Sequence, residues 1–351
     1  MRTDVLIVGG GIIGASILRR LAEAGLRTML IEGRRPGLGA TGYSGAMVRV
    51  AHPTAAEAAA AGEGLAAYRA FPDESGGRVA LRESGHLYFG RTPVLESILS
   101  EVAALSPDAR ILTRDEISAR WPGLAVTAET AIYEPHAGYA NPMAFVCHQI
   151  DKAVDAGAHV AESVLLNQLL PGDGQMQGAQ TSLGRIETKT VILATGPQTP
   201  QLLERHGLTV AEIWSQKIQV SCFDIGEEAE SWPGFFDDTR GLNGVPSACR
   251  GTYHIGWPTG LHMMPSENGS HEATPAHATA TRNAAQVLIP GAAKARFRGA
   301  MCHTDCYSTT PIGVIGPGRR LPDGLLLATG FSGGGFKMAP HAARRIYEFL
   351  A

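Results

Sequence analysis

The sequence predicts an α/β protein in which a parallel sheet covered by helices is interleaved along the chain with a β-rich, antiparallel part. Short uninterrupted apolar segments, typical of buried parallel strands, occur near residues 5, 28, 190 and 325. Between them, above all in residues 211–265, strand-like stretches alternate with turns. The apolar strands lie near both ends and in the middle of the chain, so the two parts are interleaved and not consecutive. A chain of 351 residues also predicts about two domains.

The first thirty residues have the order strand, helix, strand. Residues 5–8 (VLIV) form an apolar strand, and residues 15–24 have the apolar spacing of a helix that Gly25 ends. Residues 28–31 form a second apolar strand. This order predicts a βαβ unit at the start of the parallel sheet.

The turn of this unit carries the pattern G-x-G-x-x-G, at Gly9, Gly11 and Gly14. In dinucleotide sites the first glycine allows the tight turn, the second lets the backbone approach a pyrophosphate, and the third lets helix and strand pack closely. The helix N-terminus offers N–H donors to phosphate, and Glu32 can accept hydrogen bonds from the ribose hydroxyls. An acid here argues against the 2′-phosphate of NADP, but it does not separate NAD from FAD. The alternative is a glycine-rich turn that binds nothing.

The later elements follow from the same patterns. Alanine with spaced apolar residues, or a proline in the first turn, favours helices, and alternating or wholly apolar runs favour strands. In chain order we expect a helix at 55–71, a strand at 84–89, helices at 94–105 and 142–156, strands at 190–194 and 325–329, and a final helix at 339–350 whose first turn contains Pro340.

The composition excludes several functions. Lys plus Arg is 30 against 33 for Asp plus Glu, so no basic excess exists to bind nucleic acid. No uninterrupted apolar stretch approaches about 18 residues, which predicts no membrane span. The N-terminus has an early arginine and an apolar run like a signal peptide, but Asp4 precedes the run and no cleavage site follows. Five cysteines, an odd and small number, favour reduced thiols and a cytoplasmic location.

One cluster invites a metal interpretation. Cys302 and Cys306 bracket His303 and Asp305, but a zinc site needs about four ligands and no second spaced pair exists. We therefore expect no metal.

Four segments together carry a family resemblance. They are VLIVGGGIIGASILRRLAEAG with Glu32, the loop GATGYSGAMVR, TVILATGP at 190–197, and GLLLATGFSGGGFKMAP at 324–340. The chain resembles the D-amino-acid oxidase superfamily of FAD enzymes, in particular its sarcosine oxidase and glycine oxidase branch. NAD-only enzymes lack the last two segments, so the resemblance favours FAD.

The resemblance implies a Rossmann-like FAD-binding domain of the glutathione-reductase type, interleaved with a β-rich, antiparallel-sheet substrate domain. The expected boundaries place 1–77, 141–210 and 306–351 in the FAD-binding domain, and 78–140 and 211–305 in the substrate domain. The small residues at 330–335 can bring backbone N–H groups close to a flavin edge that becomes negative on reduction. The expected FAD contacts are Gly9, Gly11, Ile12, Ile13, Gly14, Glu32, Gly33, Arg34, Ala40, Thr41, Ser44, Gly45, Ala46, Met47, Val164, Ala194, Thr195, Gly196, Gly330, Ser332, Gly333, Gly334, Gly335, Phe336 and Lys337.

The resemblance also implies oxidation of a small amino acid or N-alkyl amino acid. The α C–H bond gives a hydride to flavin N5, the imine product hydrolyses, and O2 or another acceptor takes the electrons. Lys337 matches the lysine of the G-F-S-G-x-G-F-K signature that binds the substrate carboxylate. Arg49 would be a second carboxylate or flavin contact, with a surface arginine as the alternative. Tyr307 matches the tyrosine that faces the substrate. Tyr253, His254 and His262 lie in the strand pair that the resemblance expects to form the active-site wall.

Departures from the family pattern leave points open. His262 replaces a lysine that activates oxygen, and a protonated histidine would supply the same charge, so oxidase and dehydrogenase both remain candidates. Ile312 stands where the family has an aspartate, and the glycine-oxidase arginine is absent. Some relatives bind FAD covalently through a cysteine just before the tyrosine. Asp305 takes that position here, so we expect non-covalent FAD, with a link through Cys306 or Cys302 as the alternative.

Two other functions keep the same fold. The chain could oxidise a 2-hydroxy acid or a small biosynthetic intermediate, because fold does not fix substrate. It could also be a non-catalytic flavoprotein subunit of a hetero-oligomer, and the sequence leaves the oligomeric state open.

Overall fold

The computed structural model describes residues 1–124, 126–247, 249, 251–261 and 272–351. Its first sheet is the predicted parallel one, with β18 alone running antiparallel, against β19. In spatial order its strands are β18 (Val314–Pro317), β19 (Leu325–Thr329), β12 (Thr190–Leu193), β1 (Val5–Val8), β2 (Thr28–Glu32) and β8 (His159–Glu162).

Both faces of this sheet are buried, which explains why its strands read as continuous apolar runs. Val5 and Ile7 pack with three helices on one face, whereas Leu6 and Val8 pack on the other with a small three-stranded sheet. The helices are α1 (Ile12–Glu23), α5 (Pro142–Asp155) and α8 (Gly335–Leu350), and the small sheet contains β9 (Leu166–Gly172), β10 (Gln175–Thr181) and β11 (Gly184–Glu187). Helix α6 (Thr199–Arg205) adds Leu203 to the second face.

The second sheet has eight strands and is antiparallel except where β14 pairs with β4. In spatial order they are β17 (Arg296–Ser308), β13 (Ile213–Asp224), β16 (Thr252–Gly256), β15 (Leu242–Pro246), β14 (Gly234–Asp237), β4 (His86–Phe89), β6 (Thr130–Glu134) and β5 (Arg110–Thr113). These strands come from two stretches of the chain, with parts of the first sheet between them. The α/β fold class with an interleaved β-rich part is thus confirmed, while the exact domain boundaries stay a prediction.

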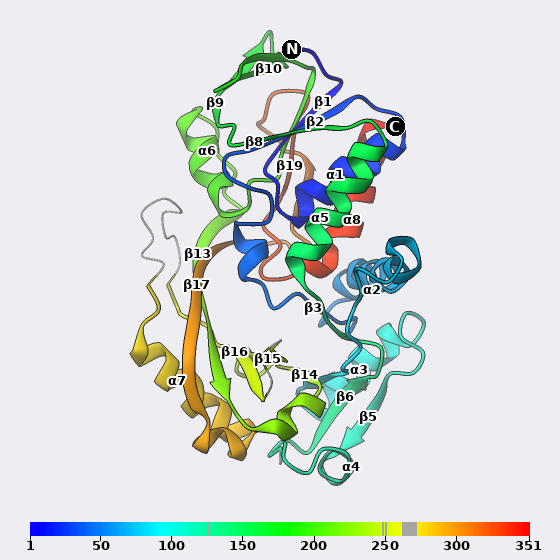
Figure 1. Ribbon diagram of the computed structural model, residues 1–351, viewed down its shortest axis with the longest axis vertical. Helices are drawn as coiled ribbons and strands as arrows, with labels where there is room; N and C mark the ends of the chain where they lie inside the picture. The colour runs from blue at the N-terminus through cyan, green and yellow to red at the C-terminus, as the bar shows by residue number, and fades with distance from the viewer. Residues whose placement is uncertain (125, 248, 250, 262–271) are drawn as a thin grey trace.

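Strands β13 and β17 connect the two halves. They pair antiparallel over twelve positions and run from the parallel-sheet half down into the eight-stranded half (Figure 1). Helices α4 (Arg114–Arg120) and α7 (Pro275–Leu288) pack beside the second sheet, and no helix of the described part of the chain is long and apolar enough to span a bilayer.

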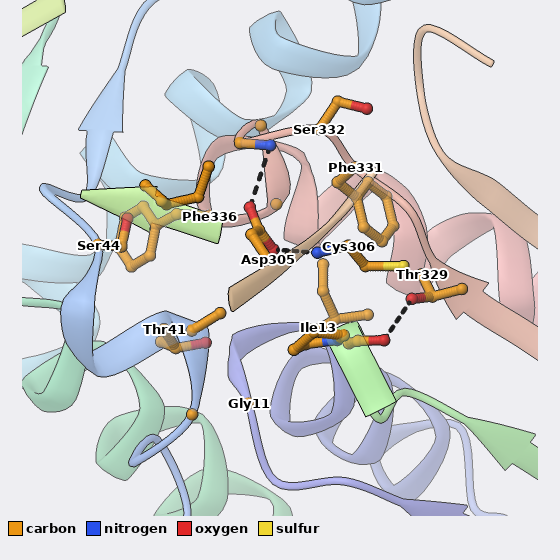
Figure 2. Close-up of a pocket in the computed structure, with 18 of the residues that line it drawn as sticks. Gly11, Ile13, Thr41, Ser44, Asp305, Cys306, Thr329, Phe331, Ser332 and Phe336 are labelled. Atoms are coloured by element: carbon orange, nitrogen blue, oxygen red, sulfur yellow. Dashed lines mark hydrogen bonds between the residues drawn. The ribbon is translucent and has the colours of Figure 1, made fainter. Parts of the chain in front are cut away.

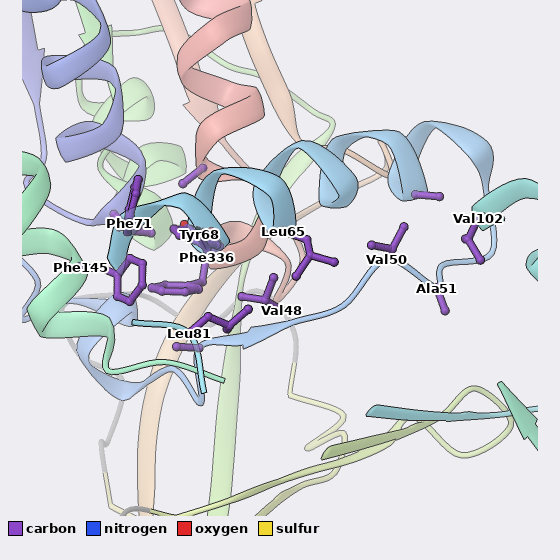
Figure 3. Packing of buried hydrophobic residues seen from close by; sticks show 14 of the residues in the cluster. Val48, Val50, Ala51, Leu65, Tyr68, Phe71, Leu81, Val102, Phe145 and Phe336 are labelled. Atoms are coloured by element: carbon purple, nitrogen blue, oxygen red, sulfur yellow. Dashed lines mark hydrogen bonds between the residues drawn. The ribbon is translucent and has the colours of Figure 1, made fainter. Parts of the chain in front are cut away.

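A further core joins the two halves around α2 (Ala55–Ser75). Tyr68 and Phe71 of α2 pack with Phe145 of α5 and Phe336 of α8, beside the segment Val48–Ala51 (Figure 3). Helix α3 (Thr92–Val102) and the small pairing of β3 (Met47–Val48) with β7 (Gly138–Tyr139) complete this layer.

The last helix begins four residues earlier than expected. Pro340 has no N–H, so the carbonyl of Phe336 loses its usual partner inside the helix. The hydroxyl of Tyr68 donates to this carbonyl instead. A tertiary hydrogen bond therefore lets α8 begin at Gly335, which a local reading of Pro340 as a first-turn residue could not anticipate.

Helix α7 and the small sheet were not predicted. In α7 the buried residues Ala278, Thr281, Ala285 and Leu288 have helical spacing, but their small or polar side chains make the stripe weak. In the small sheet, glutamine-rich strands expose one face, and this weakens the apolar signal.

Candidate active site

A cavity of about 820 Å³ lies between the two sheets. Its lining comes from the loops that follow β1, β2, β12 and β19, and from residues of β13, β15, β16 and β17. Ligands of α/β proteins bind at the carboxyl ends of parallel strands, and this volume lies within the usual range for a cofactor site. All the predicted FAD contacts line the cavity except Gly14.

Gly9 and Gly14 determine the backbone conformation and the close packing of the turn between β1 and α1. Gly9 has a φ of +107°, and a Cβ at Gly14 would lie 1.9 Å from the carbonyl oxygen of Gly9. Gly14 is therefore a packing residue between α1 and β1, as the motif predicts. Gly11 precedes the first residue of α1 and lines the cavity, and the N–H of Ile12 donates to Oγ1 of Thr41 over 3.1 Å.

Glu32 ends β2 with its carboxylate held in place. Oε2 accepts a hydrogen bond from the N–H of Gly10 at 2.8 Å, and Oε1 accepts one from the N–H of Arg34 at 2.9 Å. Each carboxylate oxygen keeps a free lone pair beyond these bonds. A fixed acceptor at this end of the cavity suits the hydroxyls of a ribose.

The loop after β2 contacts β17 through a pair of stacked aromatic rings. Residues Ala40–Tyr43 form a short 3₁₀ helix, and the ring of Tyr43 stacks on that of His303 with centroids 5.2 Å apart. Ser44 Oγ accepts from the N–H of Ala46, a residue with a φ of +45°. Figure 2 shows Thr41 and Ser44 of this loop among the residues that line the pocket.

Arg49 is buried, with 5% of its surface exposed, which excludes the surface alternative. Its guanidinium lies over the rings of Phe236 (4.6 Å to the centroid) and Tyr88 (5.1 Å), and Nη1 donates to the carbonyl of Ala51. Its Nε is buried without a hydrogen-bond partner among the described residues. Arg49 also lines the cavity, so it presents a desolvated cation there.

Lys337, in the first turn of α8, is the second buried cation of the cavity, with 8% exposure. Burial, together with the positive charge of Arg49, lowers the pKa of Lys337 to about 7, although Glu57 and Asp305 oppose the shift. Within the described parts of the chain, neither Lys337 nor Arg49 forms an ion pair with a carboxylate. An anion that entered the cavity would meet two cations without such partners.

Tyr307 lines the cavity beside Trp214, with ring centroids 6.2 Å apart. Burial raises the pKa of its phenol, which stays protonated and can donate a hydrogen bond. Tyr307 and Lys337 thus line one cavity, as the sequence predicts.

Tyr253 requires a correction. It does not line the cavity: it is fully buried in the core behind the sheet, stacks on Phe235, and donates from its hydroxyl to the carbonyl of Pro233. Successive strand residues point to opposite faces, so the next residue of β16, His254, is the one that lines the cavity. Burial lowers the pKa of His254, which favours a neutral imidazole.

His262, the predicted counterpart of the oxygen-activating lysine, lies outside the described residues. The choice between oxidase and dehydrogenase therefore stays a prediction at this position.

Neither cysteine near Tyr307 has the character of a nucleophile. Cys306 is 2% exposed, and burial raises the pKa of its thiol to about 12. Cys302 is 4% exposed, lies outside the cavity lining, and also has a pKa raised by burial. Since the thiolate is the reactive form, these environments favour non-covalent FAD. Within the described residues, no group of three or more His, Cys, Asp or Glu side chains could hold a metal ion.

Several cavity residues were missed from the sequence. His52 follows Arg49, Gln216 lies on β13, and His303 and Asp305 lie on β17. The alternation of His303, Asp305 and Tyr307 along one strand was the available signal, because residues two apart share a face.

The residues present fit FAD. Glu32 and the backbone around Gly11 suit the adenosine and pyrophosphate, and the cavity continues past Thr41 and the segment 330–335 to the buried cations. FAD, when bound, would be held by the predicted contact residues that line this cavity.

Comparisons with known proteins give the family and the fold of the chain. A family described as "FAD dependent oxidoreductase" matches residues 4–348. The chain is 27% identical to 4-methylaminobutanoate oxidase (formaldehyde-forming) of Paenarthrobacter nicotinovorans, over 98% of this chain but 43% of that protein. It is 24% identical to monomeric sarcosine oxidase of Bacillus sp. (strain B-0618), over 96% of this chain and 89% of that one. Among solved structures, L-proline dehydrogenase from P. horikoshii has a TM-score of 0.88 at 21% identity, covering 100% of this chain and 93% of the other. The chain therefore spans less than half the length of the 4-methylaminobutanoate oxidase that it matches.

Proposed function

This chain belongs to the family of FAD dependent oxidoreductases, and we propose that it oxidises the C–N bond of a small amino acid or N-alkyl amino acid. The sequence relatives of the preceding comparison include a sarcosine oxidase, in agreement with the predicted branch. The name of the other describes a methylamino carboxylate as its substrate. That class of molecule, a secondary or primary amine with a carboxylate, is the substrate class we propose here.

The observation that carries this proposal is the pair of buried cations, Arg49 and Lys337, in the cavity that contains Glu32. Burying a charge without an opposite partner costs free energy, so a pair of such cations is expected where a ligand supplies the opposite charge. A carboxylate is the acid group common to all amino acids, and the fork of an arginine matches it in geometry.

The remaining residues complete the site. Arg49 and Lys337 bind the carboxylate and so orient the substrate, and Tyr307 offers a phenol O–H to its polar end. His254, with its lowered pKa, adds a neutral imidazole to the wall. Both sheets contribute side chains or loops to the wall of the cavity. FAD, when bound, would supply the oxidising power for removal of a hydride from the carbon next to the nitrogen.

A panel of substrates tests the proposal. The FAD-loaded protein is mixed under anaerobic conditions with amino acids, N-methyl amino acids and 2-hydroxy acids, and the flavin absorbance is recorded. We expect bleaching by one or more amino or N-alkyl amino acids, and none by 2-hydroxy acids. Return of the colour in air identifies O2 as the electron acceptor, while persistent bleaching identifies a dehydrogenase.

Three results would overturn the proposal in different ways. Bleaching by 2-hydroxy acids alone would assign the same carboxylate site to alcohol oxidation. Bound FAD that no member of the panel reduces would favour a non-catalytic flavoprotein subunit. A protein that takes up no FAD would remove the basis of the proposal.

A further inference from the structure

We propose that Asp305 is an electrostatic positioning residue, which holds a negative charge in the wall of the FAD cavity and lowers the reduction potential of bound FAD. The inference rests on the proposed function only in that FAD occupies this cavity. It concerns a residue that the reaction as described above does not use.

Asp305 lies on β17, in register with Gln216 of β13. Its half-buried side chain lines the cavity together with those of its strand neighbours His303 and Tyr307, which share its face. Figure 2 shows the carboxyl group of Asp305 in the pocket, near the segment that carries Ser332 and Phe336. The charge is thus located on the wall of the cavity and not on the outer surface of the protein.

Both carboxylate oxygens are occupied by backbone donors. Oδ1 accepts from the N–H of Cys306 at 2.8 Å, and Oδ2 accepts from the N–H of Gly333 at 3.2 Å. An ionised carboxylate is the natural acceptor for two converging N–H groups, and it makes stronger bonds with them than a neutral acceptor would. The geometry therefore favours the ionised form of Asp305 at neutral and alkaline pH.

One of these donors belongs to the segment 330–335. The N–H of Ser332 donates to the carbonyl of Cys306, and that of Gly334 donates to the carbonyl of Phe331. With Gly333 bound to Asp305, three successive N–H groups of this segment are already engaged by the protein. The expectation that these small residues hold N–H groups free for a reduced flavin is therefore not met at 332–334.

The consequence is electrostatic. Reduction adds negative charge to the flavin, and a fixed anion in a cavity of low dielectric disfavours that charge. Lys337 and Arg49 supply the opposing positive charge, and Lys337 is the cation coupled to Asp305. When a substrate carboxylate binds to these cations, it offsets part of their positive charge while the charge of Asp305 remains, so the effect of Asp305 on the potential persists in the complex.

The test measures the midpoint potential of bound FAD with redox dyes, which requires no substrate. Wild type is compared with Asp305→Asn, which removes the charge and keeps one acceptor oxygen. Asp238→Asn is the matched control, because it makes the same charge change at an exposed residue of the same cavity. All three proteins are measured at pH 8 and pH 5.

At pH 8 we expect Asp305→Asn to raise the potential by about 30 mV or more, a tenfold gain in the ratio of reduced to oxidised FAD. The control should shift it much less. Burial raises the pKa of Asp305 to about 6, so at pH 5 wild type is protonated too and the difference should nearly vanish. The other titratable groups coupled to Asp305 are Tyr307, Cys306 and Lys337, and these, with the cavity histidines, are present in both proteins.

Equal potentials of wild type and Asp305→Asn at pH 8, with FAD bound to both, would overturn this inference and leave the proposed function intact. A difference that is the same at pH 8 and pH 5 would also contradict it, because that result indicates a structural change and not a charge. If Asp305→Asn does not fold, the midpoint potential of wild-type FAD, measured from pH 8 to pH 5, still tests the inference. An inflection near pH 6 that is retained in both Asp238→Asn and Lys337→Met supports the inference, because Lys337 also titrates in this range, and its absence contradicts the inference. Failure of all three proteins to bind FAD would instead contradict the proposed function.

Discussion

The two ends of the cavity are built in different ways. At the nucleotide end, the turn after β1 and Glu32 supply backbone groups and one carboxylate from one short stretch of chain. At the substrate end the contacts are side chains from remote elements, with Arg49 after β3, Tyr307 on β17 and Lys337 on α8. The first end depends on close backbone packing and the second on buried charge. Substitutions should therefore affect the two ends through different properties.

The largest effect is expected at the nucleotide end. Gly14→Ala places a Cβ 1.9 Å from the carbonyl oxygen of Gly9, where only a backbone shift of β1 or α1 can relieve the clash. We expect a loss of about 3 kcal/mol or more in the free energy of unfolding, and loss of FAD binding. Thermal unfolding and an FAD titration measure both. Gly291→Ala, whose Cβ would meet no atom closer than 3.4 Å, is the control and should be near neutral.

The next effect is confined to the substrate end. Arg49→Met removes a cation but keeps an apolar stem between Tyr88 and Phe236. We expect kcat/KM to fall by about 30-fold to 5,000-fold, since truncating one partner of a buried charge pair costs about 2–5 kcal/mol. The Kd for FAD should stay nearly unchanged. A comparable loss of FAD affinity would show that the two ends are not separable.

Replacement of Lys337 should increase the free energy of unfolding, whereas Gly14→Ala should decrease it. The unfolded lysine keeps its proton up to about pH 10, whereas the folded one, with a pKa of about 7, releases it earlier. The unfolded state therefore binds more protons between these values, and wild-type stability rises with pH across this window. Lys337→Met lacks this penalty and should be more stable than wild type at pH 7, by about 1–4 kcal/mol. Denaturant unfolding at pH 7 and pH 9 checks both the gain and its decrease at the higher pH.

The same titration should govern binding. Lys337 is cationic below about pH 7, so a competing carboxylate such as acetate should bind more weakly as the pH rises from 7 to 9. The inhibition constant in wild type is expected to increase about tenfold over this range. In Lys337→Met the constant should be weak throughout and almost independent of pH. A pH dependence that survives in the variant would assign the titration to another group.

The smallest effects are expected for substitutions on the two opposite faces of β16. Tyr253→Phe removes a hydroxyl that donates to Pro233 in the core, and should cost about 1 kcal/mol of stability without changing kcat/KM. His254→Phe, at the adjacent position that lines the cavity, should alter kcat/KM and leave stability less affected. An activity change in Tyr253→Phe would restore that residue to the site.

The nucleotide end could be predicted from the sequence more fully than the substrate end, because its residues are close together in the chain. The strand of Val5–Val8, the glycine turn and Glu32 are adjacent in the chain, and local patterns determine their arrangement. The role of Tyr253 depended on strand phase, and an error of one residue moved the prediction from the cavity to the core. The start of α8 depended on Tyr68, nearly 270 residues away, which satisfies the carbonyl that Pro340 leaves free. The hydrogen bonds of Asp305 join β17 to the segment after β19, and no local pattern contains them.

The most direct test of the account compares an N-methyl amino acid with the same amine lacking its carboxylate, as anaerobic reductants of the FAD-loaded protein. We predict that wild type is reduced at least about 100-fold faster, in kcat/KM terms, by the acid than by the plain amine. We also predict that Arg49→Met loses most of this preference while still binding FAD. Equal reduction of wild type by both molecules would contradict the claim that Arg49 and Lys337 form a carboxylate site beside the flavin.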